Sequence, residues 1–94
     1  MARRARLAAT FRRSLATLGV HAKSPEYRAV FGAIAALADA DELPGSSDQE
    51  TSFAPGGAFV RRVSDLDAWL LYRFDAERLF VMTARGEPPV PGGT

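Results

Sequence analysis

The chain has 94 residues, of which 47% are hydrophobic and 24% charged; these values are ordinary for a globular protein and exclude a wholly disordered one. The length predicts one domain over residues 1–94, with a modest core. The absence of cysteine excludes disulfides and cysteine-based zinc sites, and one histidine is too few for a histidine-ligated metal. No apolar run approaches the roughly 18 residues of a membrane span, and the basic N-terminus lacks the apolar segment of a signal peptide. We therefore expect a soluble cytoplasmic protein that uses no metal or cofactor and no membrane.

The net charge is only +1, but the charges are distributed unevenly along the chain. Residues 1–23 carry six cations and no acid, residues 24–54 carry one arginine against six acids, and residues 55–94 balance five arginines against five acids. Such asymmetry indicates a basic surface that meets an anionic partner, although a solvated N-terminal arm explains it equally well. All cations of the last segment are arginines, which suit bidentate contacts with phosphate or carboxylate better than lysines do.

The first 18 residues predict one helix, and the segment before that helix, residues 1–9, has two possible interpretations. The helix covers residues 10–18, with Thr10 as its N-cap and Gly19 as the residue that ends it. In residues 1–9 charged and apolar side chains alternate, which is typical of a short edge strand. The apolar residues of the same segment also continue the helical spacing, so an extension of the helix is the second interpretation.

A second helix is predicted from Ser24 to about Ala40. Ser24, Pro25 and Glu26 supply the N-cap, the first helical residue and an acid in the first turn. Apolar residues then recur at the 3.6-residue spacing of a helix; they are Tyr27, Val30, Phe31, Ile34, Leu37 and Ala38. Gly32 inside this helix costs roughly 1 kcal/mol relative to alanine, so we expect another element to pack closely against it. Acids crowd the C-terminal end, where the helix dipole disfavours them, and predict fraying there.

Two segments are rich in proline and glycine. Residues 43–57 predict a polar loop, and about 15 residues is long for a connection in a compact domain, so the loop is either mobile or functional. Residues 86–94 hold three prolines and three glycines, which predicts an extended tail.

Residues 59–63, 68–74 and 78–85 predict three consecutive β-strands, because each is a largely apolar run without glycine or proline, bounded by Asp or Ser. The short turns between them require antiparallel pairing. The middle strand is apolar on both faces, with Tyr72 on one and Trp69 on the other, so it belongs in the interior of the sheet. Two helices packed on one face of this meander, with a fourth strand if residues 1–9 join it, make an α+β fold.

The sequences that fill these elements resemble the RelE/ParE superfamily of toxins from type II toxin–antitoxin systems. ATFRRSLATL at residues 9–18 is similar to the first helix of the family. VRRVSDLDAWLLYRFDAERLFVMTAR at residues 60–85 is similar to its basic strand, its apolar-apolar-Tyr-Arg strand, its Asp-centred turn and its final strand. The most diagnostic part is Leu71-Tyr72-Arg73 followed by Asp75. The resemblance spans most of the chain and implies a short strand, two helices and a three-stranded C-terminal sheet.

Members of this family either cut mRNA on the ribosome without a metal or poison DNA gyrase, and a cognate antitoxin protein binds each of them. By position, Arg61 or Arg62 stands where the cleaving branch places phosphate-binding cations, Arg73 follows the family's tyrosine, and Arg85 ends the last strand. The resemblance thus implies an mRNA endoribonuclease with these four arginines as catalytic residues and with the antitoxin, mRNA and the ribosome as partners. Two departures favour the alternatives, a gyrase inhibitor or an inactive interaction module. Trp69 stands where the cleaving branch commonly has arginine, and the segment after Arg85 lacks its late catalytic Arg, His or Tyr.

Metal-free RNA cleavage needs a base for the ribose 2′-OH, cations for the charge that develops on the phosphate, and an acid for the leaving oxygen. The four arginines supply only the cations. His21 is the only side chain with an ordinary pKa near neutrality, but its place between the two helices favours an ordinary turn residue. Glu87 is a candidate by its position just past Arg85. Tyr72 alternates with apolar residues, which favours packing over proton transfer.

Trp69 lies on the opposite face of the middle strand from Tyr72, where it can stack a nucleobase, anchor a partner protein or simply cover the sheet. Arg61 and Arg62 point to opposite faces because side chains alternate along a strand. If Arg62 shares the face of Trp69, an arginine–aromatic patch results, and the strand register decides this. The predicted RNA-binding residues are Trp69, Lys23, Arg12 and Arg13.

Overall fold

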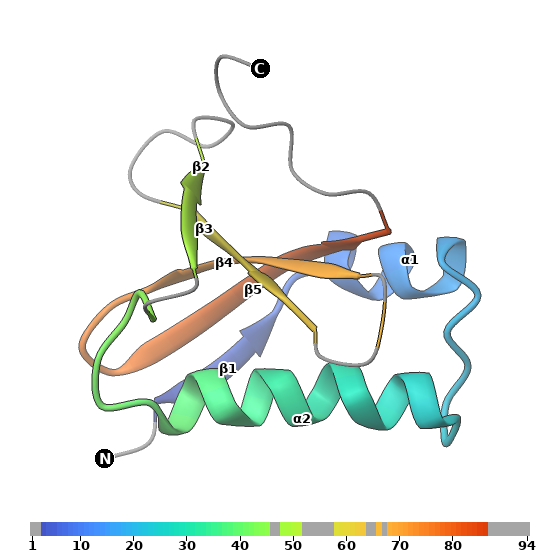
Figure 1. Cartoon of the computed structure of the whole chain (residues 1–94), viewed down its shortest axis with the longest axis horizontal. Helices are drawn as coiled ribbons and strands as arrows, with labels where there is room; N and C mark the ends of the chain where they lie inside the picture. The colour runs from blue at the N-terminus through green and yellow to red at the C-terminus, as the bar shows by residue number, and fades with distance from the viewer. Residues whose placement is uncertain (1–2, 46–47, 52–57, 64–65, 67, 87–94) are drawn as a thin grey trace.

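The computed structural model describes residues 3–45, 48–51, 58–63, 66 and 68–86. Two helices and five strands follow one another along these residues (Figure 1). They are β1 Arg4–Leu7, α1 Ala9–Thr17, α2 Pro25–Asp39, β2 Gln49–Thr51, β3 Ala58–Arg62, β4 Trp69–Phe74 and β5 Arg78–Arg85. The strands form one mixed sheet in the order β1-β5-β4-β3-β2, so the α+β prediction is confirmed.

The antiparallel meander of β3, β4 and β5 is also confirmed. β1 lies beside β5 and runs parallel to it, with Leu7 opposite Val81. The alternating segment before the first helix is therefore a strand and not an extension of that helix. A parallel return needs a long connection, which the whole chain between β1 and β5 provides.

β2 is the strand that the sequence did not predict. It pairs antiparallel with β3, with Gln49 opposite Val60, inside the segment predicted to be a loop. Its sequence is Gln-Glu-Thr, which lacks the alternation of apolar and polar residues that predicts a strand. Residues 46–47 and 52–57 of the same segment, and the predicted tail from residue 87, lie outside the described residues.

α1 begins one residue earlier than predicted, and its N-cap is different. Ala8 occupies the N-cap position and makes no side-chain cap, while the Thr10 hydroxyl donates to the Met82 carbonyl at 2.5 Å. Thr10 therefore ties the helix to β5. The predicted C-terminal end is confirmed: Gly19 has φ +74°, and the Val20 amide donates to the Leu15 carbonyl at 2.9 Å, as in a Schellman motif.

α2 begins as predicted, but the packing at Gly32 and the contacts at the C-terminal end of the helix differ from the predictions. The Ser24 hydroxyl accepts a hydrogen bond from the Tyr27 amide at 3.1 Å, the N-cap contact. Gly32 is exposed, and a Cβ placed there would meet nothing within 4 Å, so the expected close packing is wrong. At the end predicted to fray, the Arg3 amide and guanidinium donate to the carbonyls of Ala38 and Ala40, at 2.7 and 2.8 Å. These bonds satisfy acceptors that a helix end otherwise leaves to water.

The core lies between the two helices and one face of the sheet. α1 contributes Phe11 and Leu15, and α2 contributes every third or fourth residue of its predicted apolar stripe. The sheet contributes residues that alternate along its strands except between Val81 and Ala84, where β5 is irregular; they are Leu70 and Tyr72 of β4 and Leu79, Val81 and Ala84 of β5. Because strand side chains alternate, the residues between these project to the other face of the sheet.

Candidate nucleic-acid interface

Three adjacent strands place one arginine on each side of the only tryptophan. In the sheet register, Arg62 of β3 is directly opposite Trp69 of β4, and Trp69 is directly opposite Arg85 of β5. Residues directly opposite each other on paired strands project to the same face. Neighbouring strands lie roughly 4.8 Å apart, so the outer two backbone positions are roughly 10 Å apart. The arginine–aromatic patch that the sequence left conditional on register is therefore present.

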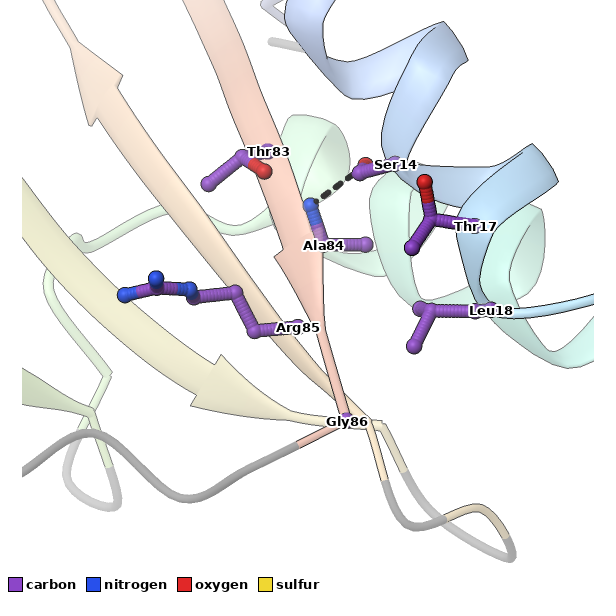
Figure 2. Close-up of a pocket in the computed structure, with 7 residues that line it drawn as sticks. All are labelled: Ser14, Thr17, Leu18, Thr83, Ala84, Arg85 and Gly86. Carbon is purple, nitrogen blue, oxygen red and sulfur yellow. Dashed lines mark hydrogen bonds between the residues drawn. The ribbon is translucent and has the colours of Figure 1, made fainter.

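This row projects away from the helices. Leu70 follows Trp69 on β4 and is fully buried in the core, and its partner on β5 is the buried Ala84. Trp69 and Arg85 alternate with these residues and so lie on the other face. Figure 2 shows the same division, with Ala84 turned toward α1 while Thr83 and Arg85 point away from it. Arg62 and Arg85 are exposed, and Trp69 is partly exposed.

The face that carries this row is strongly cationic. β1, β3, β4 and β5 together contain seven arginines and no acidic residue. Register places six of the seven on the side away from the helices, and we call this side the arginine face. Its arginines are Arg4, Arg6, Arg62, Arg73, Arg78 and Arg85. Ala58 and Val60, near its β2 end, are buried, so the face is not exposed throughout.

The seventh arginine, Arg61, is on the helix side and makes a different set of contacts. Its partner in the register is the buried Leu70. Its guanidinium binds both carboxylate oxygens of Asp48, Nε to Oδ1 at 2.6 Å and one terminal nitrogen to Oδ2 at 2.9 Å. The structure therefore separates Arg61 from Arg62, Arg73 and Arg85, the other three predicted catalytic residues.

Asp48 is the centre of a buried polar cluster that the sequence did not reveal. None of its side chain is exposed. Besides Arg61, its carboxylate accepts hydrogen bonds from the Tyr72 hydroxyl and from the Gly45 amide, the latter at 2.8 Å. A Cβ at Gly45 would collide with a guanidinium nitrogen of Arg61, so a larger residue there would have to displace the end of the Arg61 side chain from the Asp48 carboxylate. We call Gly45, Asp48, Arg61 and Tyr72 the Asp48 cluster.

The cluster fixes the protonation of Asp48 and Tyr72. Burial acts to raise the pKa of the Asp48 carboxyl, but the hydrogen bonds from Arg61, Tyr72 and the Gly45 amide outweigh it, and the pKa lies below its ordinary value. Burial and then the contact with the Asp48 carboxylate raise the pKa of the Tyr72 hydroxyl well above 10. At neutral pH Asp48 is therefore ionised and Tyr72 keeps its proton, which agrees with the packing role predicted for Tyr72.

The remaining predicted residues do not join the arginine face. Arg12 and Arg13 are exposed on α1, the helix that packs on the opposite side of the sheet, and Lys23 is exposed between the two helices at φ +68°. His21 is exposed in the same turn, where its carbonyl accepts from the Ser24 hydroxyl at 2.6 Å. Glu87 lies outside the described residues. Of the residues predicted from the sequence, the structure thus places Arg62, Trp69, Arg73 and Arg85 on the arginine face. The predicted RNA-binding residues Lys23, Arg12 and Arg13 are not part of this candidate interface.

A hollow of about 530 Å³ opens beside the end of β5, between it and α1. Figure 2 shows its lining, which consists of Ser14, Thr17, Leu18, Thr83, Ala84, Arg85 and Gly86. The Ser14 hydroxyl donates to the Phe11 carbonyl at 2.6 Å and accepts from the Ala84 amide at 2.9 Å, so its hydrogen bonds are used within the fold. The hollow adds concave surface next to the arginine face but no acid or base.

The arginine face can bind an anionic chain and stack an unpaired base, because guanidinium groups pair with phosphates and every base has a π-face. It offers no histidine, carboxylate or amine within β1, β3, β4 and β5 that can move a proton. Within the described part of the chain, no group of three or more His, Cys, Asp or Glu can hold a metal ion, and no helix is both long and apolar enough to cross a membrane. No protein-family model, no curated protein and no solved structure matches this chain.

Proposed function

We propose that the chain is a toxin of the RelE/ParE type that binds mRNA on its arginine face and cuts it on the ribosome without a metal. The observation that carries the proposal is the row of Arg62, Trp69 and Arg85 across three adjacent strands. Apart from β2, which stands between α2 and the meander, the elements follow the order that the sequence resemblance implies: a strand, two helices and a meander. A ribosomal target also makes the cytoplasm the expected compartment.

Each residue of the row has a separate role in this proposal. Trp69 stacks on an unpaired base, a contact worth ~1–3 kcal/mol. Arg62 and Arg85 bind the phosphates on either side and stabilise the negative charge that develops when the 2′-oxygen attacks. A purely electrostatic site of this kind lowers the barrier without a metal, but it leaves the proton transfers to solvent, to the ribosome or to residues outside the described part of the chain.

The test is cleavage of mRNA positioned on ribosomes by purified protein, read by primer extension. Wild type is expected to cut, and Arg62→Ala combined with Arg85→Ala is expected to lose nearly all cutting. The matched control combines Arg12→Ala with Arg13→Ala, which removes the same two charges from α1, on the other side of the sheet, and keeps full activity. Intact mRNA with folded wild-type protein overturns the proposal, and equal loss in both double variants moves the site away from the row.

A second candidate is a non-enzymatic inhibitor of DNA gyrase. One observation favours it: the strands of the arginine face carry no side chain that can act as a general acid or base near neutral pH. A protein that only binds gyrase needs none. A supercoiling assay at micromolar protein separates the two functions, because inhibition together with uncut mRNA selects this candidate.

For either function we infer that a cognate antitoxin binds this chain and covers the arginine face. A partner with acidic residues fits, because the four strands beneath the face contain arginines and no acids. Its gene is expected beside that of the toxin. Co-expression of the neighbouring reading frame is expected to yield a complex and to relieve growth arrest. Failure to form a complex removes that frame as the antitoxin.

A further inference from the structure

The arginine face carries a second row with the same composition as the first. Phe80 of β5 is directly opposite Arg73 of β4 on one side and Arg6 of β1 on the other. One aromatic ring is thus again flanked by two arginines across three adjacent strands. Beyond it, Arg4 of β1 is directly opposite Arg78 of β5. We call Arg6, Phe80 and Arg73 the second row.

An irregularity in β5 is what brings both rows to one face. Phe80 and Arg85 are five positions apart, so on a regular strand they would project to opposite faces. Leu71 is opposite Thr83 and Tyr72 is opposite Val81, which leaves Met82 without a partner on β4. This β-bulge shifts the alternation by one residue. As a result Phe80 and Arg85 both face away from the helices, while Val81 and Ala84 both remain buried.

The second row is separated from the first by a distance that suits a nucleic-acid strand. Along β4, Arg73 is four residues beyond Trp69, which is roughly 13 Å, and the row is centred one strand further across the sheet. The direct distance is therefore roughly 14 Å, or about four nucleotides at the ~3.4 Å spacing of a stacked strand. One RNA strand of modest length reaches both rows.

The charges themselves favour an anionic ligand at this end of the face. Arg4, Arg6 and Arg78 are exposed, and Arg4 and Arg78 are like charges directly opposite each other. Such a pair is unfavourable in a sheet, and the Asp75 carboxylate in the turn before β5, which accepts from the Arg78 amide at 2.7 Å, offsets part of the charge. A phosphate bound between the two guanidinium groups relieves that repulsion and adds charge-assisted hydrogen bonds.

We propose that the second row, extended by Arg4 and Arg78, binds the backbone of the same RNA strand several nucleotides away from the base on Trp69. The strand then crosses the sheet diagonally from β3 to β1, with Phe80 as a second surface for stacking. This inference rests on the proposed binding of RNA to the arginine face. It makes the ligand a single strand of about six or more nucleotides.

The test is the salt dependence of binding to a fluorescein-labelled 15-nucleotide single-stranded RNA, measured by anisotropy. For single strands, each phosphate contact contributes about 0.7 to the slope of log affinity against log salt. Arg4→Ala with Arg6→Ala is expected to reduce that slope by about 1.4, as is Arg62→Ala with Arg85→Ala. Arg12→Ala with Arg13→Ala has the same net charge and is expected to leave the slope unchanged.

Oligonucleotide length gives an independent measurement. Wild-type affinity is expected to rise more steeply once the RNA exceeds about four nucleotides, the separation of the two rows. That rise is expected to be absent from the Arg4→Ala, Arg6→Ala variant, because only the first row remains. If this variant fails to fold, as judged by circular dichroism, Arg78→Ala replaces it, with an expected decrease in slope of about 0.7.

The outcomes separate this inference from the function on which it rests. No binding of any RNA by folded wild type overturns both. Binding that weakens in Arg62→Ala with Arg85→Ala, while Arg4→Ala with Arg6→Ala behaves like the α1 control, overturns the second row alone. The second-row proposal is also overturned if Arg4→Ala with Arg6→Ala decreases the salt slope as expected but wild-type affinity does not depend on RNA length. The two rows would then bind separate RNA molecules.

Discussion

Arg61 and Arg62 are neighbours on β3, yet they belong to two regions with opposite properties. Arg61 turns to the helix side, where the buried carboxylate of Asp48 neutralises it. Arg62 turns to the arginine face, where it is exposed beside Trp69 and where the strands carry no acid. The same residue type, one position apart, contributes to stability in one region and offers charge to a ligand in the other.

The comparison shows that an arginine count does not locate a binding site. What distinguishes the two regions is exposure: the Arg61 guanidinium binds a buried carboxylate, whereas Arg62 is exposed on a face whose strands carry no acid. In the Asp48 cluster the carboxylate accepts hydrogen bonds from the Arg61 guanidinium, the Tyr72 hydroxyl and the Gly45 amide. On the arginine face Arg62 and Arg85 are exposed, so their guanidinium groups can reach an anionic ligand, and Arg4 and Arg78 are like charges directly opposite each other.

The largest expected effect comes from breaking the Asp48 cluster. Asp48→Ala is expected to lower the free energy of unfolding by about 3 kcal/mol, the lower end for a broken buried ion pair, because it leaves Arg61 without its carboxylate. The lower end applies because 21% of the Arg61 side chain is exposed and can be hydrated. Urea denaturation measures the change. Asp41→Ala, an exposed acid after α2, is the control and is expected to change stability by less than about 0.5 kcal/mol.

The same cluster predicts a pH dependence with a definite sign. The pKa of Asp48 is lower in the folded protein than its ordinary value of 3.8, so its stabilisation is complete above that value and is lost as the pH falls through the folded pKa. Wild type is therefore expected to exceed Asp48→Asn in stability at pH 7, and the difference is expected to shrink below pH 3.8. Urea denaturation between pH 7 and pH 3 checks it, and a difference that is constant over this range contradicts the assignment.

On the other side of the sheet, removing the tryptophan ring is expected to affect binding rather than folding. Trp69→Ala is expected to lower the affinity for single-stranded RNA about tenfold, because the loss of one stacked base is worth ~1–3 kcal/mol. Trp69→Phe keeps a ring and is expected to retain most of the affinity. Anisotropy at fixed salt measures both. Equal affinity for all three proteins shows that Trp69 only covers the sheet.

Local sequence patterns predicted most of this fold. The 3.6-residue stripe and the Ser-Pro-Glu start predicted α2, and three apolar runs separated by short polar turns predicted the meander. The N-cap prediction for Thr10 was wrong because a Ser, Thr, Asp or Asn before a helix is only a local signal. Here the Thr10 hydroxyl donates a hydrogen bond to the Met82 carbonyl of β5 instead. β2 was missed because its three polar residues pair with β3 without contributing an apolar pattern.

The candidate site was harder to predict from the sequence than the fold, because the site depends on the register of the strands. Arg62 and Trp69 could be placed on one strand each, but their alignment follows from pairing that no single strand encodes. The bulge at Met82 has no signature in Arg78–Arg85, and without it the second row would face the helices. The burial of Asp48 depends on Arg61 and Tyr72, 13 and 24 positions away along the chain, so a window of neighbouring residues does not contain it.

A smaller effect is expected from the Tyr72 hydroxyl. Tyr72→Phe keeps the buried ring and removes one hydrogen bond to the carboxylate of Asp48. Hydrogen bonds to charged groups contribute about 1.5–3 kcal/mol, and we expect about 1.5 because Arg61 and the Gly45 amide still bind the carboxylate. Thermal or urea denaturation measures it. Unchanged stability would show that water replaces the hydroxyl, and lost RNA binding with unchanged stability would move Tyr72 into the binding site.

The smallest expected effect is the most discriminating, because it compares the two neighbouring arginines directly. Arg62→Ala removes an exposed side chain and is expected to change the free energy of unfolding by less than about 0.5 kcal/mol, while it weakens RNA binding. Arg61→Ala is expected to do the reverse: it leaves the Asp48 carboxylate buried with fewer donors, destabilises the fold, and preserves the affinity of the molecules that remain folded. Both variants lose one charge from the same strand, so net charge cannot explain a difference between them. If the two variants lose equal stability and equal affinity, Arg61 and Arg62 do not have separate roles in folding and in RNA binding. The arginine face is then no better a candidate for the binding site than the rest of the surface.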